Sequence, residues 1–231
     1  MIKVTLIDSM GSDLSVVNAA RVSFGKESEW EKSYQTLKDK DIKLIKYLAE
    51  HKHFSPFGHA FASFHVKAPI FVARQLVKHK FLRWNEISRR YVDDPPEIYV
   101  PNVWRGKSKD KKQGSAGVVD LTAINSWGEP YQGRFGEADL AYVVHEDQHQ
   151  MVKTYNTLIE QGVAPEQARM ILPQSTMTEW WWSGSLDAFA DMCKLRCKED
   201  TQYETRLVAD QISKEMKQLF PVSWAALVGE T

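Results

Sequence analysis

One segment concentrates the polar chemistry of the chain: residues 73–91, which read ARQLVKHKFLRWNEISRRY. Between Arg74 and Arg90 it carries six lysines and arginines and one histidine against a single acid, Glu86. The whole chain of 231 residues balances 30 lysines and arginines against 30 acids, so this local excess needs a reason. It marks either an ordinary solvated face or a site that binds an anionic ligand.

The first half of this segment has the pattern of a helix. Pro69 suits the first helical position, because its missing N–H costs nothing there, and the helix is expected to run to about His79. In such a helix Arg74 and Lys78 share one face at i,i+4, as do Gln75 and His79.

Beyond Trp84 the pattern changes to period two, which places Glu86, Ser88 and Arg90 on one side of an extended segment. A carboxylate, a hydroxyl and a guanidinium together suit a nucleotide, since arginine forks a phosphate and the carboxylate accepts from a ribose hydroxyl or a ring N–H. Two other interpretations stay open. One is a solvated charged face, and the other is a single-strand nucleic-acid groove in which the aromatic side chains of this segment stack on bases.

The rest of the chain predicts several helices and a few short strands. Strands are expected at 3–8, 61–66 and 176–182. Helices are expected at 14–24, 31–52, 137–161, 186–197 and 204–220, with a short helical piece between Pro165 and Pro173. Residues 93–135 are rich in proline and glycine and form a long excursion. We therefore expect an α+β fold in a single domain over 1–231, with a loop-rich insertion at about 103–135.

Composition excludes several classes of protein. A zero formal charge argues against a chain that coats nucleic acid or an anionic membrane. No run reaches the roughly 18–20 apolar residues of a membrane span, and Asp8 comes too early for a secretion signal, so a cytoplasmic protein is expected. Cys193 and Cys197 cannot form a disulfide framework; they are expected to be small buried hydrophobes, and no metal site is predicted.

Residues 53–91 resemble the signature region of the flavin-dependent thymidylate synthases. That family's motif is Arg-His-Arg, seven residues, then Ser, with Arg two positions further. Here it takes the form Lys-His-Lys at 78–80, followed by Ser88 and Arg90. The segments ARMILP (168–173) and LRCKEDTQYE (195–204) resemble two further blocks of the family, so the resemblance covers most of the chain outside 103–135.

The resemblance implies a concrete activity. Members of the family make dTMP from dUMP, with 5,10-methylenetetrahydrofolate as carbon donor and FAD as hydride source after reduction by NADPH. They are homotetramers with a small, mainly antiparallel sheet and several long helices, and their four sites lie at subunit interfaces. The partners implied are these small molecules and further copies of the chain, with no nucleic acid and no membrane.

The resemblance also implies the site residues. Contacts to dUMP would come from Gln75, Leu76, Val77, Lys78, Glu86, Ile87, Ser88, Arg89, Arg90, Arg169 and Arg196. Contacts to FAD would come from His53, Ser55, Lys78, His79, Lys80, Glu86, Ser185, Leu186, Asp187 and Asp191. The catalytic residue would be Arg196, which in the family lies against the uracil edge and stabilises the charge that builds there.

The sequence departs from the family at several of these positions. Lysines replace both arginines beside His79, so the charge stays and the bidentate fork is lost. Asp191 stands where the family usually has Asn, and Arg83 where it has a small Ser. These changes leave an alternative outcome on the same fold, a flavin- and folate-dependent hydroxymethylation of dUMP. The run Trp180–Trp182 is expected to lie in the core or at a subunit interface.

Overall fold

A computed structural model describes residues 1–31, 36–92, 94–109, 114–119, 121, 132–133, 136–137 and 140–229. The chain divides into two compact units. The sheet unit comprises Ile2–Lys67, Arg74–Glu86 and Glu179–Thr231, and the α4 unit comprises Met1, Ala68–Ala73 and Ile87–Thr178. No helix in the described part of the chain combines the length and the apolarity needed to cross a membrane.

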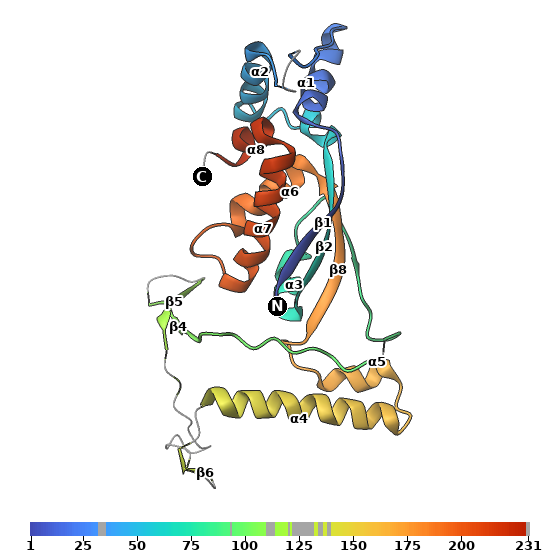
Figure 1. Ribbon diagram of the computed structural model, residues 1–231, viewed down its shortest axis with the longest axis vertical. Helices are drawn as coiled ribbons and strands as arrows, with labels where there is room; N and C mark the ends of the chain where they lie inside the picture. The colour runs from blue at the N-terminus through green and yellow to red at the C-terminus, as the bar shows by residue number, and fades with distance from the viewer. Residues whose placement is uncertain are drawn as a thin grey trace. The chain divides into compact units, whose positions relative to one another are not determined.

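A four-stranded sheet in the order β1-β2-β8-β3 organises the sheet unit (Figure 1). Its strands are β1 (Lys3–Met10), β2 (Phe61–Pro69), β8 (Met177–Ser185) and β3 (Leu82–Glu86). β1 runs antiparallel to β2 and β3 antiparallel to β8, which confirms the small antiparallel sheet expected from the sequence. Strand β3 was not expected as a separate element.

Alternation along the strands builds the core. Phe64 of β2 and Trp182 of β8 are buried, and both meet the ring of Phe189 edge-on, at centroid distances of 5.2 and 5.6 Å. Phe189 belongs to α6 (Leu186–Arg196), which together with α7 (Tyr203–Leu219) covers one face of the sheet (Figure 1). The intervening residues, such as His65 and Trp181, face away from these helices and are partly exposed.

Further helices complete the sheet unit: α1 (Asp13–Arg21), η1 (Val22–Phe24), α2 (Asp39–Glu50), η2 (Ser55–His59) and α8 (Pro221–Val228). The buried carboxylate of Asp13 accepts from the backbone N–H groups of Val222 and Ser223, each at 2.9 Å. It therefore caps the otherwise unsatisfied first turn of α8. Helix α8 was not expected, because its apolar sequence lacks a helical period.

The α4 unit is built around α4 (Leu140–Glu160), followed by α5 (Pro165–Ala168) and η3 (Arg169–Ile171). In the predicted insertion, β4 (Arg105–Lys107) pairs antiparallel with β5 (Ser115–Val118), and β6 (Gln132–Gly133) pairs with β7 (Gly136–Glu137). The remainder of the 103–135 segment lies mostly outside the described residues. The chain at the start of β8 is tied by the backbone bonds Ile70 N–H to Thr176 O (2.9 Å) and Met177 N–H to Glu97 O (2.8 Å).

Several predicted boundaries are wrong, among them those of two helices. The helix expected over 31–52 begins only at Asp39, because Lys38 is extended, with φ −64° and ψ 147°. The helix expected over 69–79 is α3 (Ile70–Leu76), and Pro69 instead ends β2. After the end of α3 the chain turns, with His79 N–H bonded to Leu76 O at 3.1 Å and Phe81 at a left-handed φ of 65°. Lys78 and His79 therefore lie in a turn and not on a helix face shared with Arg74 and Gln75.

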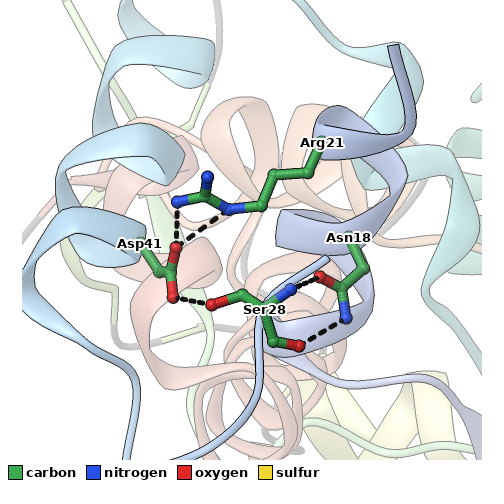
Figure 2. A network of polar contacts seen from close by, with 4 residues as sticks. All are labelled: Asn18, Arg21, Ser28 and Asp41. Atoms are coloured by element: carbon green, nitrogen blue, oxygen red, sulfur yellow. Dashed lines mark hydrogen bonds and ion pairs between the residues drawn. The ribbon is translucent and has the colours of Figure 1, made fainter. Parts of the chain in front are cut away.

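A buried carboxylate joins α2 to α1 and the segment between them (Figure 2). Asp41 is fully buried; it accepts from Arg21 Nε at 3.1 Å and also from Arg21 Nη2, while its other oxygen accepts from Ser28 Oγ. Ser28 in turn exchanges two hydrogen bonds with the amide of Asn18, at 2.8 and 3.0 Å. Every group in this network has a partner, which is the condition under which burying a charge is tolerated.

Replacing Asp41 with Asn is expected to destabilise the protein by about 3 kcal/mol, because Arg21 would keep a largely buried charge without its counter-ion. Asp39→Asn is the matched control, since Asp39 is exposed and lies two residues before Asp41 on α2. Its loss is expected to cost less than about 1 kcal/mol. Urea unfolding followed by circular dichroism measures both. Equal midpoints for the two variants would contradict the role given to Asp41.

Candidate active site

The cationic motif lies in the turn between α3 and β3. Lys78 and Lys80 are exposed, and His79 between them is half-buried. Gln75, one turn back on α3, is held in place by α7: its Nε2 donates to Gln202 Oε1, and Thr205 Oγ1 donates to its Oε1 at 3.2 Å. The turn thus starts from a fixed helix end. It presents two exposed lysines with the imidazole of His79 between them.

His79 is oriented by an arginine 117 residues further along the chain. Arg196, in the last turn of α6, donates from Nε to His79 Nε2 at 3.0 Å. Since Nε2 accepts this bond, the imidazole is neutral and carries its proton on Nδ1. Burial, together with the smaller effect of the nearby Arg196 charge and against the opposing effect of Asp191, lowers the pKa of His79 to about 4. At neutral pH this histidine is therefore an acceptor for arginine and not a cation.

Arg196 is fixed by this bond at one nitrogen only. Among the described residues none accepts from its two terminal amino groups, although burial lowers the pKa of its guanidinium. The group still carries its charge at neutral pH, because the ordinary pKa of arginine lies far above that range. A half-buried guanidinium with its outer edge unsatisfied is prepared for an anionic or carbonyl-bearing ligand.

Glu86, at the end of β3, is held from its own strand. The indole Nε1 of Trp84 donates to Glu86 Oε2 at 3.1 Å, and the Trp84 ring stacks on Trp180 at a centroid distance of 4.4 Å. Trp180 is buried in the sheet, so the donor that orients the carboxylate stands on a rigid base. Reasoning from the sequence missed this role; the period-two spacing of 84 and 86 on a strand was the available signal.

The beginning of α6 gathers other predicted residues. Ser185 occupies the N-cap position with an extended backbone, and its Oγ donates to Asp187 Oδ1 at 2.5 Å instead of accepting from a capping N–H. A pocket of about 450 Å³ opens beside it, lined by Phe61, Phe81, Leu82, Arg83, Ser183, Gly184 and Ser185. Phe81 is 87% exposed. An exposed aromatic ring beside a helix N-terminus can receive a planar ligand that carries phosphate.

Two predicted residues have buried side chains, so any contact that they make with a ligand would come from their backbone atoms. Leu76 and Leu186 are fully buried, and the N–H of Leu186 donates to Ala60 O at 2.8 Å. Val77, by contrast, is 48% exposed. The predicted contacts of Leu76 and Leu186 stay predictions, and in the fold these two residues anchor the end of α3 and the start of α6.

Other predicted flavin residues lie on the surface of the sheet unit. The His53 ring lies 6.2 Å from Tyr47 and 6.4 Å from His51, and the three rings are nearly parallel. Ser55 begins η2, which packs against α6. The carboxylate of Asp191, on α6, pairs with Lys194 Nζ at 3.3 Å.

The remaining predicted nucleotide residues belong to the α4 unit. Ser88 and Arg90 lie beyond the end of β3, in a turn closed by Tyr91 N–H to Ser88 O at 2.9 Å, so the expected extended segment through Arg90 is wrong. They nevertheless meet, since Arg90 Nε donates to Ser88 Oγ at 3.3 Å. Arg89 pairs with Asp94, with Nη1 3.5 Å from Oδ1. Ile87 is 41% exposed.

Arg169 begins η3 of the α4 unit and is exposed. Its Nε donates to Glu166 O at 3.3 Å, which holds the side chain along its own short helix. The structure therefore brings together His79 with Arg196 and Ser88 with Arg90. Glu86 and Ile87, neighbours in sequence, fall on the two sides of the unit boundary.

Of the two cysteines, Cys193 is buried as expected from the sequence, whereas Cys197 is partly exposed. Cys193 is fully buried and donates to Ala209 O at 3.6 Å, and burial raises the pKa of its thiol well above the ordinary value. A thiol held protonated is a poor nucleophile. Within the described ranges no group of three or more His, Cys, Asp or Glu side chains is arranged to hold a metal ion.

Comparison with known proteins identifies the class of protein. Residues 5–222 match the family model described as thymidylate synthase complementing protein. A flavin-dependent thymidylate synthase of Thermus thermophilus is 38% identical over 224 residues, which is 96% of this chain and 74% of the relative. One from Kosmotoga olearia is 37% identical over 225 residues, 97% of this chain and 89% of the relative. The chain belongs to the family of flavin-dependent thymidylate synthases.

A solved structure agrees with the fold. The UMP/dUMP methylase PolB from Streptomyces cacaoi, bound with 5-Br dUMP, superposes with a TM-score of 0.78 at 30% sequence identity. The alignment covers 98% of this chain and 94% of that chain. The α+β architecture expected from the sequence is thus confirmed.

The state of His79 can be measured directly. We expect its pKa, followed by NMR of the imidazole protons, to lie near 4. Arg196→Gln should raise this pKa but leave it below 6.5, because burial is the larger cause and survives the substitution. Lys43→Gln, which removes an exposed lysine of α2, is the control and should leave it unchanged. A wild-type pKa near 6.5 would refute the buried, neutral state.

Proposed function

We propose that the protein converts dUMP to dTMP, with 5,10-methylenetetrahydrofolate as carbon donor and FAD, reduced by NADPH, as hydride source. The single observation that carries this proposal is the Arg196–His79 pair in a chain of this family. It presents a fixed cation whose outer edge has no partner among the described residues. The relatives are named flavin-dependent thymidylate synthases, and the structural neighbour is a UMP/dUMP methylase bound to 5-Br dUMP.

The residues of the sheet unit fit a flavin dinucleotide. Lys78 and Lys80 supply exposed positive charge, and the 11-residue helix α6 offers its N-terminal N–H groups to a phosphate. Phe81 and Phe61 line the adjoining pocket and suit a planar ring. In the proposal His53, Ser55, Lys78, His79, Lys80, Glu86, Ser185, Leu186, Asp187 and Asp191 hold FAD. Once bound and reduced, the flavin supplies the hydride that turns the transferred carbon into a methyl group.

Two sets of residues would hold the nucleotide. In the sheet unit these are Gln75, Leu76, Val77, Lys78, Glu86 and Arg196. In the α4 unit they are Ile87, Ser88, Arg89, Arg90 and Arg169. Arg90 and Ser88 already contact each other and together offer a guanidinium and a hydroxyl, which suits the phosphate of dUMP. Glu86 suits an N–H or hydroxyl donor of the substrate.

Arg196 is the proposed catalytic residue. With its terminal amino groups against the uracil edge, it stabilises the negative charge that spreads over the ring as C5 attacks the one-carbon electrophile. Neutral His79 accepts from Arg196 Nε and so fixes the plane of the guanidinium without adding a second charge beside it. A protonated His79 would repel Arg196, so the low pKa of His79 is part of the same device. No enzyme thiol takes part.

We infer that the protein is a homotetramer with sites shared between copies. Two features support this. The predicted flavin residues Ser185–Asp187 and the Arg196 pair stand at opposite ends of α6, about 15 Å apart along an 11-residue helix. The face of the sheet away from α6 carries the exposed Trp181 and the pair His65–Glu179 at 3.1 Å, and it has no helix of the sheet unit upon it among the described elements (Figure 1).

We also propose that the chain acts as one domain with an insertion at about 103–135, since the family model runs through both units without a break. A cytoplasmic location is proposed as well, because the two cysteines are free, as in reducing compartments.

Mass analysis of the product tests the reaction. From dUMP, methylenetetrahydrofolate, NADPH and FAD, the protein is expected to release a nucleotide heavier than dUMP by one CH2 group. Arg196→Gln should lower turnover by about a hundredfold, because it removes charge stabilisation in the transition state. Arg206→Gln, on α7, is the matched control. A product heavier by CH2O would identify hydroxymethylation, and the absence of product with bound FAD would refute the proposal.

The role of Trp84 is tested by Trp84→Phe, which keeps a ring to stack on Trp180 and removes the N–H that orients Glu86. We expect a loss of about 1 kcal/mol in dUMP binding, roughly fivefold in KM, with little change in kcat. Trp224→Phe is the control, since it also loses an indole bond, to Ser213 at 3.1 Å. In a Glu86→Ala background, which has no side-chain acceptor for the indole N–H, Trp84→Phe should have no further effect. A full additional effect there would show that Trp84 does not act through Glu86.

A further inference from the structure

Helix α4 carries a pair of histidines that the proposed reaction does not use. His145 and His149 are four residues apart and therefore share one face of the helix. Their ring centroids lie 4.2 Å apart, and Nε2 of one ring lies 3.0 Å from Nε2 of the other. Both histidines and their neighbours described below belong to the α4 unit.

Two ring nitrogens at this distance cannot both carry a proton. At least one presents a bare lone pair toward the other, and if both rings carry their protons on Nδ1, two lone pairs converge on one point. A zinc-type ion sits about 2.0–2.1 Å from each imidazole nitrogen, and a tetrahedral angle between them separates the nitrogens by about 3.3 Å. The observed separation of 3.0 Å needs only a small ring rotation to accept such an ion.

The neighbouring carboxylate favours the tautomer that metal binding requires. Glu146 Oε1 lies 3.6 Å from His145 Nδ1, on the side of the ring away from His149. A carboxylate in this place attracts a proton to Nδ1 and leaves Nε2 free to bind a metal ion. Such a carboxylate is the usual second partner of a metal-bound histidine.

Room for the remaining ligands adjoins the pair. A pocket of about 180 Å³ is lined by Pro96, Ile98, Val100, His145, Gln148, His149 and Val152. Gln148 donates from Nε2 to Ser175 Oγ at 2.8 Å, while its buried Oε1 has no hydrogen-bond partner among the described residues. A water molecule bound to a metal ion is a strong donor and would satisfy an acceptor in this position.

We propose that His145 and His149 form a binding site for a divalent transition-metal ion of the zinc type, completed by water. No third His, Cys, Asp or Glu of the described residues joins the pair, so the site has open coordination positions. Two imidazoles and water hold such an ion less tightly than the four protein ligands of a structural zinc site. The bound ion clips two turns of α4 together and, because it binds only the folded helix, stabilises it.

Calorimetric titration of the full chain, loaded with FAD, with zinc chloride at pH 7.5 tests the site. We expect one zinc ion per chain, with affinity at least tenfold weaker in His145→Gln and in His149→Gln. His59→Gln, which removes an exposed histidine of η2, should bind zinc as the wild type does.

A second measurement reads the ligands themselves. Cu²⁺ added in place of zinc should give an electron paramagnetic resonance spectrum with coupling to two nitrogens in the wild type and to fewer in His149→Gln. Wild type without measurable zinc binding would overturn the proposal. Equal zinc affinity in wild type, His145→Gln and His149→Gln would overturn it as well, since the ion would then lie elsewhere, for example at His53 or His79.

Discussion

The hydrogen bond from Arg196 Nε to His79 Nε2 joins two predicted site residues that lie 117 positions apart in the sequence. It links the motif turn after α3 to the last turn of α6, and each partner sets the state of the other. Arg196 helps to keep the pKa of His79 low, and the neutral imidazole fixes the guanidinium while leaving its terminal amino groups for a ligand. The rest of the sheet unit serves this contact. Gln75 fixes the end of α3 against α7, and Phe189 fixes α6 against the sheet.

This pair also bears on the role of the two lysines in the motif. In a motif of Arg-His-Arg all three positions offer planar groups, whereas Lys78 and Lys80 are flexible point charges. Both are exposed, so they can follow a phosphate without fixing its orientation. In the proposed function, the ligands are oriented by Arg196 and by Glu86, which Trp84 holds, with Arg90 and Ser88 at the nucleotide phosphate. In this proposal the lysines supply positive charge, and other residues fix the geometry of the ligands.

Much of the fold could be predicted from the sequence, and the site could be predicted only in part. Alternating residues predicted β1, β2 and β8, and Trp180 and Trp182 point into the core while Trp181 does not, as period two requires. Helix ends were less predictable, because the left-handed turn at Phe81 and the extended Lys38 occur without a glycine or proline beside them to mark them in the sequence. The buried Asp41 network, the capping of α8 by Asp13 and the His79–Arg196 bond join residues far apart in sequence, where no spacing rule applies. Arg196 was indicated only through the resemblance to the family.

The central claim is that Arg196, oriented by neutral His79, meets the uracil edge of dUMP beside a bound flavin. A crystal structure of the protein with FAD and dUMP tests it most directly. The account predicts the terminal amino groups of Arg196 within hydrogen-bond distance of the pyrimidine ring, with the bond to His79 kept and the nucleotide phosphate on Arg90 and Ser88. A nucleotide bound elsewhere, or at this place with Arg196 turned into solvent, would contradict it.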